Sequence, residues 1–262
     1  MSIVITEDRG PVRHIVMNRP EKRNAINAEL IRGLAEALQA AASASEVRCV
    51  VLRGAGPMFS SGMDVGALSA LASGSGESQR LREFRSGVLA TWNLCEEMCK
   101  PTIAHIQGGC LGGAMELALA CDMRVMAAEA VIGIIETRVG LVPDVGGCSR
   151  LPSVVGLGRA KELVMASKVI DGTEAERIGL VNRVAPAAEL DAATDALVSE
   201  LMQCAPLAVG LAKRALDTAA KPALAASLEQ EVTAQQICVA SEDFAEGARA
   251  FAEQRAPTFS GR

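Results

Sequence analysis

Residues 108–122 read GGCLGGAMELALACD, and this stretch constrains the fold of the chain more than any other. Four of its first six residues are glycine, which predicts a tight turn whose backbone lies open to a neighbour or a ligand. The Ala/Leu/Met segment that follows has good helix propensity, and residues 101–106 before the turn form an apolar run typical of a buried strand. A strand, a glycine-rich turn and a helix are therefore expected in direct succession.

The same alternation of strands and helices begins at the N-terminus. Residues 3–6 and 12–17 alternate like the two strands of a hairpin, with a turn at residues 9–11. Residues 27–42 then repeat apolar positions at helical spacing, and residues 47–52 form a short apolar run. A strand, a helix and a second buried strand predict a parallel sheet, so the fold class is expected to be α/β.

Later segments continue this order. We expect a helix over residues 79–98, strands at residues 123–126 and 131–135, a helix that starts at Asp171, and a strand-like stretch at residues 179–184. Residues 66–78 are rich in Ala, Ser and Gly, which is typical of a lid or linker.

The pattern changes toward the C-terminus. Pro186, Pro206 and Pro222 punctuate a helical tail in which apolar residues recur at helical spacing. We therefore expect a core over residues 1–195 and a helical region over residues 196–262. The apolar faces of this region are expected to dock on the core, on other subunits, or on both.

Composition and charge exclude several classes of protein. Half of the 262 residues are hydrophobic but only 2% are aromatic, so the core is expected to be aliphatic and rich in alanine. No apolar run reaches transmembrane length, and residues 1–18 lack the basic-then-apolar pattern of a signal peptide, so we expect a soluble, cytoplasmic protein. The formal net charge of −5 argues against nucleic acid or an anionic membrane as the main partner.

The cysteines and histidines show no recognisable site pattern. The eight cysteines include no CxxC pair and most lie in apolar segments, so we interpret them as reduced core residues and expect neither a metal site nor a disulfide framework. His14 and His105 lie in separate strand-like runs with no nucleophile beside them. We interpret both as structural residues.

Three acidic residues stand out by their context. The chain contains no GxxxxGK[ST], GxSxG or HExxH signature, which leaves carboxylates and backbone donors as candidate functional groups. Glu116 lies in the first turn of the expected central helix, and Glu136 follows an apolar run. Asp144 lies in a second glycine-rich turn at residues 140–147. Apolar surroundings raise the pKa of a carboxyl group, which makes it a usable acid or base near neutral pH.

Each of these acids also has an ordinary structural interpretation. Glu116 suits a helix N-terminus, Glu136 suits an ion pair with Arg138, and Asp144 suits a turn or a cap. The combination of three such acids with two glycine-rich turns favours a shared site. In such a site the carboxyl groups titrate as a coupled set.

Several motifs together resemble the enoyl-CoA hydratase/isomerase, or crotonase, family, over nearly the whole chain. Residues 19–20 and 24–27 resemble its opening motif, residues 59–64 (FSSGMD) its first oxyanion motif, and residues 108–122 its second. Residues 136–147 (ETRVGLVPDVGG) resemble the acid-bearing strand and turn of the family. Residues 244–259 (FAEGARAFAEQRAPTF) resemble its C-terminal helix and tail.

The resemblance implies a fold, an assembly and a set of ligand contacts. The expected fold is a crotonase-like spiral of repeated β-β-α units with a C-terminal helical trimerisation region, assembled as a homotrimer or a dimer of trimers. The backbone N–H groups of Met63 and Gly113 would bind the thioester oxygen of an acyl-CoA substrate. The coenzyme A part would be held around Asn24, Ala25, Ile26, Ser61 and Asp64, with no metal and no further cofactor.

The resemblance also implies hydration of the 2,3 double bond of an enoyl-CoA thioester, with Glu116 activating water and Glu136 delivering a proton. Asp144 departs from this pattern, because typical hydratases have glycine there and dienoyl-CoA isomerases have aspartate. Those isomerases typically carry aspartate at the position of Glu116, so the glutamate here favours a hydratase. One alternative is a dienoyl-CoA or enoyl-CoA isomerase that uses Glu136 and Asp144. A second is a non-catalytic acyl-CoA-binding protein, which the intact acids argue against.

Overall fold

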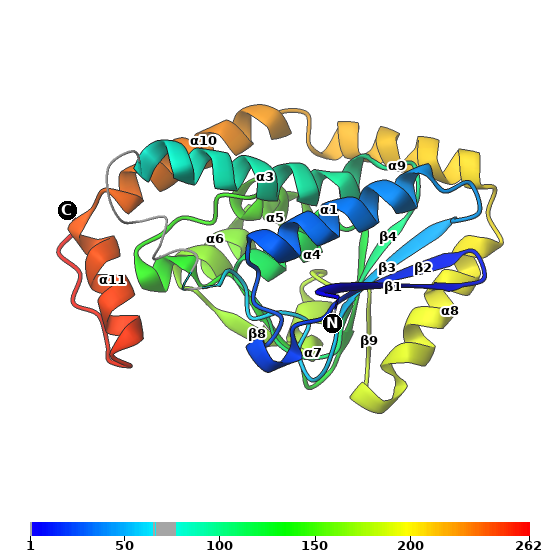
Figure 1. Cartoon of the computed structure of the whole chain (residues 1–262), viewed down its shortest axis with the longest axis horizontal. Helices are drawn as coiled ribbons and strands as arrows, with labels where there is room; N and C mark the ends of the chain where they lie inside the picture. Colours follow the sequence, from blue (N-terminus) through cyan, green and yellow to red (C-terminus); the bar gives the residue numbers. More distant parts are fainter. Residues whose placement is uncertain (1, 65, 67–76) are drawn as a thin grey trace.

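A computed structural model describes residues 2–64, 66 and 77–262 (Figure 1). The expected α/β class is confirmed, with two sheets and a set of C-terminal helices. Most of residues 66–78, expected from composition to be a lid or linker, lie outside the described residues.

The first unit of the fold agrees with the sequence pattern. Strands β1 (Val4–Arg9) and β2 (Val12–Met17) form an antiparallel hairpin, and helix α1 (Ala28–Ser43) follows the short helix η1 (Pro20–Lys22). The Asn27 side chain caps α1 by accepting a hydrogen bond from Leu30 N–H. Strand β3 (Cys49–Gly54) then pairs in parallel with β2. The strand expected at residues 47–52 begins two residues later, because Val47 N–H bonds Ala44 O in the turn after α1.

The large sheet has the strand order β1-β2-β3-β4-β6-β9 and is parallel beyond its first strand. Its later members are β4 (Thr102–Ile106), β6 (Met123–Ala127) and β9 (Arg183–Ala185). All five residues of β4 are buried, which explains its continuous apolar run. Helix α1 packs on β1 and β2, and α8 (Leu190–Met202) packs on β6 and β9.

A second sheet of three short strands includes the strand that leads into the central helix. Its order is β5-β7-β8, formed by Cys110–Leu111, Val131–Gly133 and Val169–Asp171. Strands β5 and β8 were not expected from the sequence. The strand expected at residues 131–135 ends at Gly133, because the chain then turns into the short helix η2 (Glu136–Val139). Helix α4 (Gly113–Ala120) follows β5 and is buried along its whole length.

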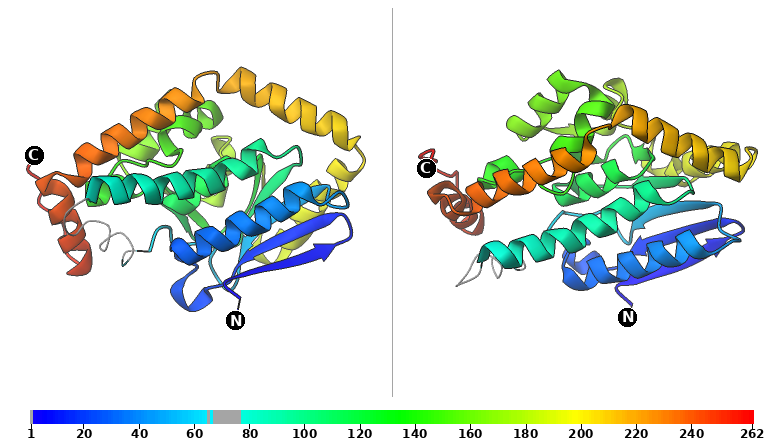
Figure 2. Two further views of the ribbon diagram at one scale, coloured as in Figure 1. Left: turned by 45° about the horizontal axis from the view of Figure 1, so that its top comes forward. Right: turned by 90° about the horizontal axis from the view of Figure 1, so that it is seen from above.

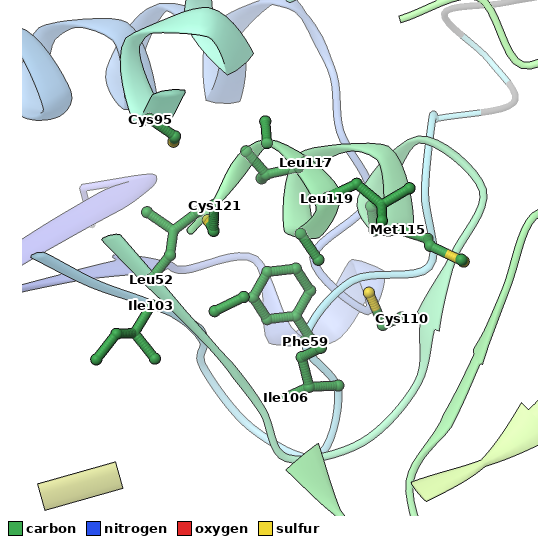
Figure 3. Close-up of a cluster of buried hydrophobic side chains, with 14 of the residues drawn as sticks. Leu52, Phe59, Cys95, Ile103, Ile106, Cys110, Met115, Leu117, Leu119 and Cys121 are labelled. Atoms are coloured by element: carbon green, nitrogen blue, oxygen red, sulfur yellow. The ribbon is translucent and has the colours of Figure 1, made fainter. Parts of the chain in front are cut away.

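The core lies between the large sheet, α3 (Glu77–Glu97) and α4. Figure 3 shows Phe59 among apolar side chains of β4, β5 and α4, including Ile106 and Cys110. Phe59 and Trp92 are both fully buried, so the few aromatic residues include two large core side chains. All eight cysteines are free thiols, and four of them, including Cys110, are buried. Cys238 was also expected in the core, but it is only half-buried.

Two α-helices lie between β7 and β8 in the chain, and a third leads from β8 to β9 of the large sheet. They are α5 (Gly147–Val155), α6 (Leu157–Met165) and α7 (Gly172–Arg177). Asp171 caps α7 as expected, by accepting a hydrogen bond from Glu174 N–H. The strand expected at residues 179–184 is wrong over residues 179–182. Leu180 N–H bonds back to Ala175 O at the end of α7, so β9 begins only at Arg183.

The C-terminal part is helical, as expected. After α8 and the short helix η3 (Ala187–Glu189) come α9 (Pro206–Ala220), α10 (Leu224–Val239) and α11 (Glu242–Ala252). Figure 2 shows α9 and α10 running along one side of the molecule and α11 at its end, near the C-terminus. The expected boundary after residue 195 falls inside α8. Within the described residues no single helix is long and apolar enough to cross a membrane, although η3–α8 and α9, which meet at 105°, pass that test as a pair.

Candidate active site

The glycine-rich turn at residues 108–113 brings two distant segments of backbone together. Gly112 has φ of +55°, and a Cβ there would lie 2.7 Å from Glu136 Oε1. Gly62 has φ of +91°, and a Cβ there would lie 2.5 Å from Leu111 O. Both positions therefore require glycine, for conformation and for space. This close approach places the FSSGMD segment directly against the start of α4.

Among the described residues, the N–H groups of Met63 and Gly113 bond no backbone acceptor, so both are available to a ligand. Ile26 N–H bonds Gly62 O and Asp64 N–H bonds Ile26 O, so this β-bridge uses the residues on either side of Met63. The N–H of Met63 itself therefore points away from Ile26. Gly113 is the first residue of α4, where an N–H has no acceptor within the helix. A carbonyl oxygen between them would accept two hydrogen bonds at the positive end of a helix.

Glu116 is buried in the first turn of α4, and its side chain is held from one side. Its Oε1 accepts hydrogen bonds from Gly147 N–H at 2.8 Å and from Val145 N–H at 3.0 Å. Burial raises the pKa of Glu116 well above its usual value, and the charges of Glu136 and Asp144 add to this effect. Because both bonds use Oε1, Oε2 is the atom left for a substrate or a water molecule.

Glu136 begins η2 and approaches the same place from the second sheet. Its Oε2 is shielded from solvent and has no hydrogen-bond partner among the described residues. Burial raises the pKa of Glu136 to about 7. An ion pair with Arg138 is not formed in the described structure, since Arg138 Nη2 instead donates to Ser167 O at 2.8 Å. Glu136 thus has the features of a proton donor or acceptor rather than of a structural ion pair.

Asp144 lies in the second glycine-rich turn with only 16% of its side chain exposed. Burial raises the pKa of Asp144 to about 7, against the opposing effect of Arg85. The Arg85 guanidinium on α3 lies 3.6 Å from Asp144 Oδ2 and donates from Nε to Asp144 O at 2.6 Å. The acid is therefore held by a side chain 59 residues away in the sequence.

These groups line one cavity of about 550 Å³. Its polar wall contains the three carboxyl groups, Ser61, and the backbone of Met63 and Gly113. Its apolar wall comes from η2, α10 and α11 and includes Val239, Phe244 and Phe251. The structure thus brings together six of the ten residues proposed from the sequence: Ser61, Met63, Gly113, Glu116, Glu136 and Asp144.

The other four proposed residues lie beside the cavity and not in its lining. Asn24 is fully buried, and its Nδ2 donates to Ala55 O at 2.9 Å and Met58 O at 2.8 Å. Ile26 is also fully buried. Arg19 donates a hydrogen bond to Ala25 O, and its Nη1 lies 3.3 Å from Asp64 Oδ2. The backbone of Asn24 and Ile26 bonds the FSSGMD segment, and contacts of this stretch with coenzyme A, which stay a prediction, would use backbone atoms.

Sequence reasoning missed Arg85, Glu231 and the apolar wall. Glu231 and Gln235 are buried on α10, on the same face as Leu228 and Val232. This spacing of three and four residues is visible in the sequence. A glutamate within an apolar stripe of a helix is the signal that could have identified Glu231. Neither His14 nor His105 lines the cavity, and His105 Nδ1 lies 3.0 Å from Thr194 Oγ1.

Fold and cavity define a class of protein. Buried acids beside two free backbone N–H groups form a site for proton transfer on a substrate that carries a carbonyl oxygen.

Comparison with known proteins gives the family. The family model described as enoyl-CoA hydratase/isomerase matches residues 7–262. The chain is 38% identical over 265 residues to human enoyl-CoA hydratase domain-containing protein 2, mitochondrial, covering 97% of this chain and 87% of that protein. Two crystal structures each match with a TM-score of 0.88. One is an enoyl-CoA hydratase from Mycobacterium avium subsp. paratuberculosis (29% identity, 98% of both chains), and the other an enoyl-CoA hydratase/isomerase from Xanthobacter autotrophicus (32% identity, 96% of this chain and 93% of that one). This chain belongs to the enoyl-CoA hydratase/isomerase family, and the expected crotonase fold is confirmed.

Proposed function

We propose that this protein is an enoyl-CoA hydratase that adds water across the 2,3 double bond of its thioester substrate. The observation that carries the proposal is that Glu116 and Glu136 line one cavity together with the N–H groups of Met63 and Gly113. The family binds acyl-CoA thioesters, and the thioester oxygen is the group that accepts hydrogen bonds from the two N–H groups. The C2–C3 double bond then lies between the carboxyl groups.

The proposed mechanism divides acid and base work between the two glutamates. The Glu116 carboxylate accepts a proton from water as the water oxygen bonds to C3. The electrons of the double bond move toward the thioester, and the enolate oxygen is stabilised by the N–H groups of Met63 and Gly113. The carboxyl group of Glu136 then donates its proton to C2. One proton is therefore carried by the pair at the start and at the end of the reaction.

The hydrogen bonds of the pair support this division. Two carboxyl groups buried in one cavity oppose the ionisation of both, so the pair holds one proton near neutral pH. The two N–H groups that bond Glu116 favour the negative charge on that residue. Glu136 Oε2 has no hydrogen-bond partner among the described residues, so it is the oxygen that can carry the proton, while hydrogen bonds from the backbone of Glu136 and Ile135 moderate the rise in the pKa of this carboxyl group.

A second candidate is an isomerase that uses Glu136 and Asp144. It is favoured by one observation: both residues line the cavity, and burial raises the pKa of each to about 7. Two carboxyl groups with similar pKa values can remove a proton from one carbon of the substrate and deliver a proton to another. The hydrogen bonds that hold Glu116 in the cavity favour the hydratase.

The experiment that separates these candidates is an assay with crotonyl-CoA and, separately, a 3,5-dienoyl-CoA. Loss of the conjugated enoyl absorbance with crotonyl-CoA supports the hydratase. Gain of conjugated dienoyl absorbance alone supports the isomerase. Acyl-CoA binding without turnover of either substrate would support the third candidate, a binding protein.

The proposed assembly is a homotrimer or a dimer of trimers. It is supported by α9, where Leu207, Leu211 and Leu216 are 76%, 57% and 69% exposed. Three large apolar side chains exposed on one helix are typical of a surface that another subunit covers. Light scattering on the purified protein tests this, and a monomer would refute it.

A further inference from the structure

Glu231 on α10 is a buried carboxylate that takes no part in the proposed reaction. It is 4% exposed, and both of its oxygens accept hydrogen bonds from the start of α5. Oε1 accepts from Ser149 N–H and Ser149 Oγ, both at 2.6 Å, and Oε2 accepts from Gly146 N–H at 3.0 Å. Burial raises the pKa of Glu231, whereas these three donors favour the ionised form of its side chain.

The backbone that Glu231 holds is the same turn that holds Glu116. Along this turn the N–H groups of Val145 and Gly147 bond Glu116, whereas those of Gly146 and Ser149 bond Glu231. Carboxylates from α4 and α10 therefore share the first N–H groups of one helix, where negative charge is stabilised.

Arg85 joins this arrangement from a third side. Its Nε donates to Asp144 O at 2.6 Å, and its Nη2 donates to Leu228 O on α10 at 2.5 Å. The turn that carries Asp144 is thus tied to α3, α4 and α10. Glu116 already places one carboxyl group at the N-terminus of α5. Glu231 adds a second one there, whereas Arg85 adds none.

We propose that Glu231 is a positioning residue that fixes the turn at residues 144–147 and thereby sets the location of Asp144 and the orientation of Glu116. This inference rests on the proposed function, since it concerns the same cavity. Glu231 does not line that cavity and touches no substrate. Its effect passes through the backbone of the turn, where a small displacement of a reacting group has a large effect on rate.

The charge of Glu231 also acts on the acids of the site. The groups that face it are Arg85 from α3, Glu116 from α4, and Asp144 and Cys148 from the turn and α5. Its negative charge contributes to the raised pKa of Glu116 and of Asp144, whereas Arg85 opposes the effect at Asp144. Removal of the charge therefore lowers the pKa of both acids.

The test compares Glu231→Gln with Glu231→Asp and with Glu229→Gln, an exposed glutamate on the same helix. Glutamine keeps the size of the side chain but turns an NH2 group toward a backbone N–H. We expect kcat to fall about 10- to 100-fold with little change in KM. We also expect the pH profile of kcat to move toward lower pH by about one unit. The aspartate variant should recover part of both effects, and Glu229→Gln should behave as wild type.

Failure of this inference is distinguishable from failure of the proposed function. If wild type hydrates crotonyl-CoA and folded Glu231→Gln matches it in kcat and pH profile, Glu231 is not a positioning residue. If wild type turns over neither substrate, the carboxyl titration of Asp144, followed by carbon-13 NMR in protein labelled at aspartate, decides instead. A titration at lower pH in Glu231→Gln than in wild type supports the inference, and an unchanged titration overturns it.

Discussion

Gly147 N–H donates a 2.8 Å hydrogen bond to Glu116 Oε1, 31 residues away in the sequence, and so joins the second glycine-rich turn to the helix that follows the first. The contact is close, because a Cβ on Gly147 would lie 2.9 Å from the same oxygen. One turn starts the helix that carries Glu116, and the other supplies the donors that orient it. The second glycine-rich turn therefore acts on the site through its backbone as well as through Asp144.

The first prediction concerns the two glutamates. Glu116→Gln and Glu136→Gln should each lower kcat for hydration by about 10²-fold or more, because each loses its ability to transfer a proton while its shape is kept. Glu36→Gln, at an exposed position of α1, is the matched control and should show wild-type kcat. Steady-state kinetics and circular dichroism on all three variants check this. Near wild-type turnover in both site variants would refute the assignment.

The sequence predicted the parts of the fold that depend on local signals. Asn27 and Asp171 cap the helices expected to start there, and the apolar run at residues 101–106 includes β4. The predicted ends of strands were less accurate where backbone groups form the hydrogen bonds of a turn instead of those of a sheet. An apolar pattern cannot show that Leu180 N–H bonds back to Ala175 O.

The candidate site was predictable for residues in glycine-rich segments and not for residues on packed helices. Glu116 follows such a segment, Glu136 precedes one, and Asp144 lies within one. Arg85 and Glu231 meet the turn at residues 144–147 only because α3 and α10 pack against it. Those contacts span 59 and 85 residues, and no local pattern determines which helices meet over such distances.

The second prediction concerns the oxyanion donor on α4. Gly113→Pro removes one N–H at the first position of a helix, where proline is otherwise tolerated. We expect hydration to be abolished in the folded variant, because one of the two hydrogen bonds to the enolate is lost. Gly113→Ala is the matched control. It places the same Cβ beside the flexible end of Met63, 2.9 Å from Cε, and keeps the N–H. If the alanine variant loses as much activity as the proline variant, the N–H is not the cause.

The third prediction concerns stability and pH. Burial raises the pKa of Asp144 from 3.8 to about 7, so the folded protein keeps a proton that the unfolded chain releases. Asp144 therefore destabilises the fold increasingly as pH rises from about 4 to about 7. The amide in Asp144→Asn does not titrate, so the variant should gain about 3 kcal/mol over wild type between pH 5 and pH 8. Urea unfolding of both proteins at the two pH values checks this.

Asp195→Asn removes an exposed carboxylate from α8 and serves as the control for that measurement. It should change stability equally at pH 5 and pH 8. If Asp144→Asn does the same, Asp144 is not held protonated by burial, and its pairing with Glu136 in an isomerase becomes untenable.

The last prediction concerns the apolar wall that α11 adds to the cavity. This helix is fixed against η2, since a Cβ on Gly247 would lie 2.6 Å from the Val139 backbone. The half-buried Phe244 lines the cavity from this helix. Phe244→Ala enlarges the cavity without touching a proton-transfer group, so kcat/KM should rise for longer enoyl-CoA thioesters relative to crotonyl-CoA. A change of about tenfold in this ratio corresponds to one or two buried methylene groups.

Phe259→Ala is the matched control, because Phe259 is 43% exposed and lies outside the cavity lining. The ratio of kcat/KM for a long and a short enoyl-CoA should be unchanged in this variant. If Phe244→Ala lowers kcat/KM for all chain lengths by one common factor, α11 does not bound the acyl chain. The helix would then act only by shielding Glu136 and Asp144 from water, and both acids would titrate at lower pH in the variant than in wild type.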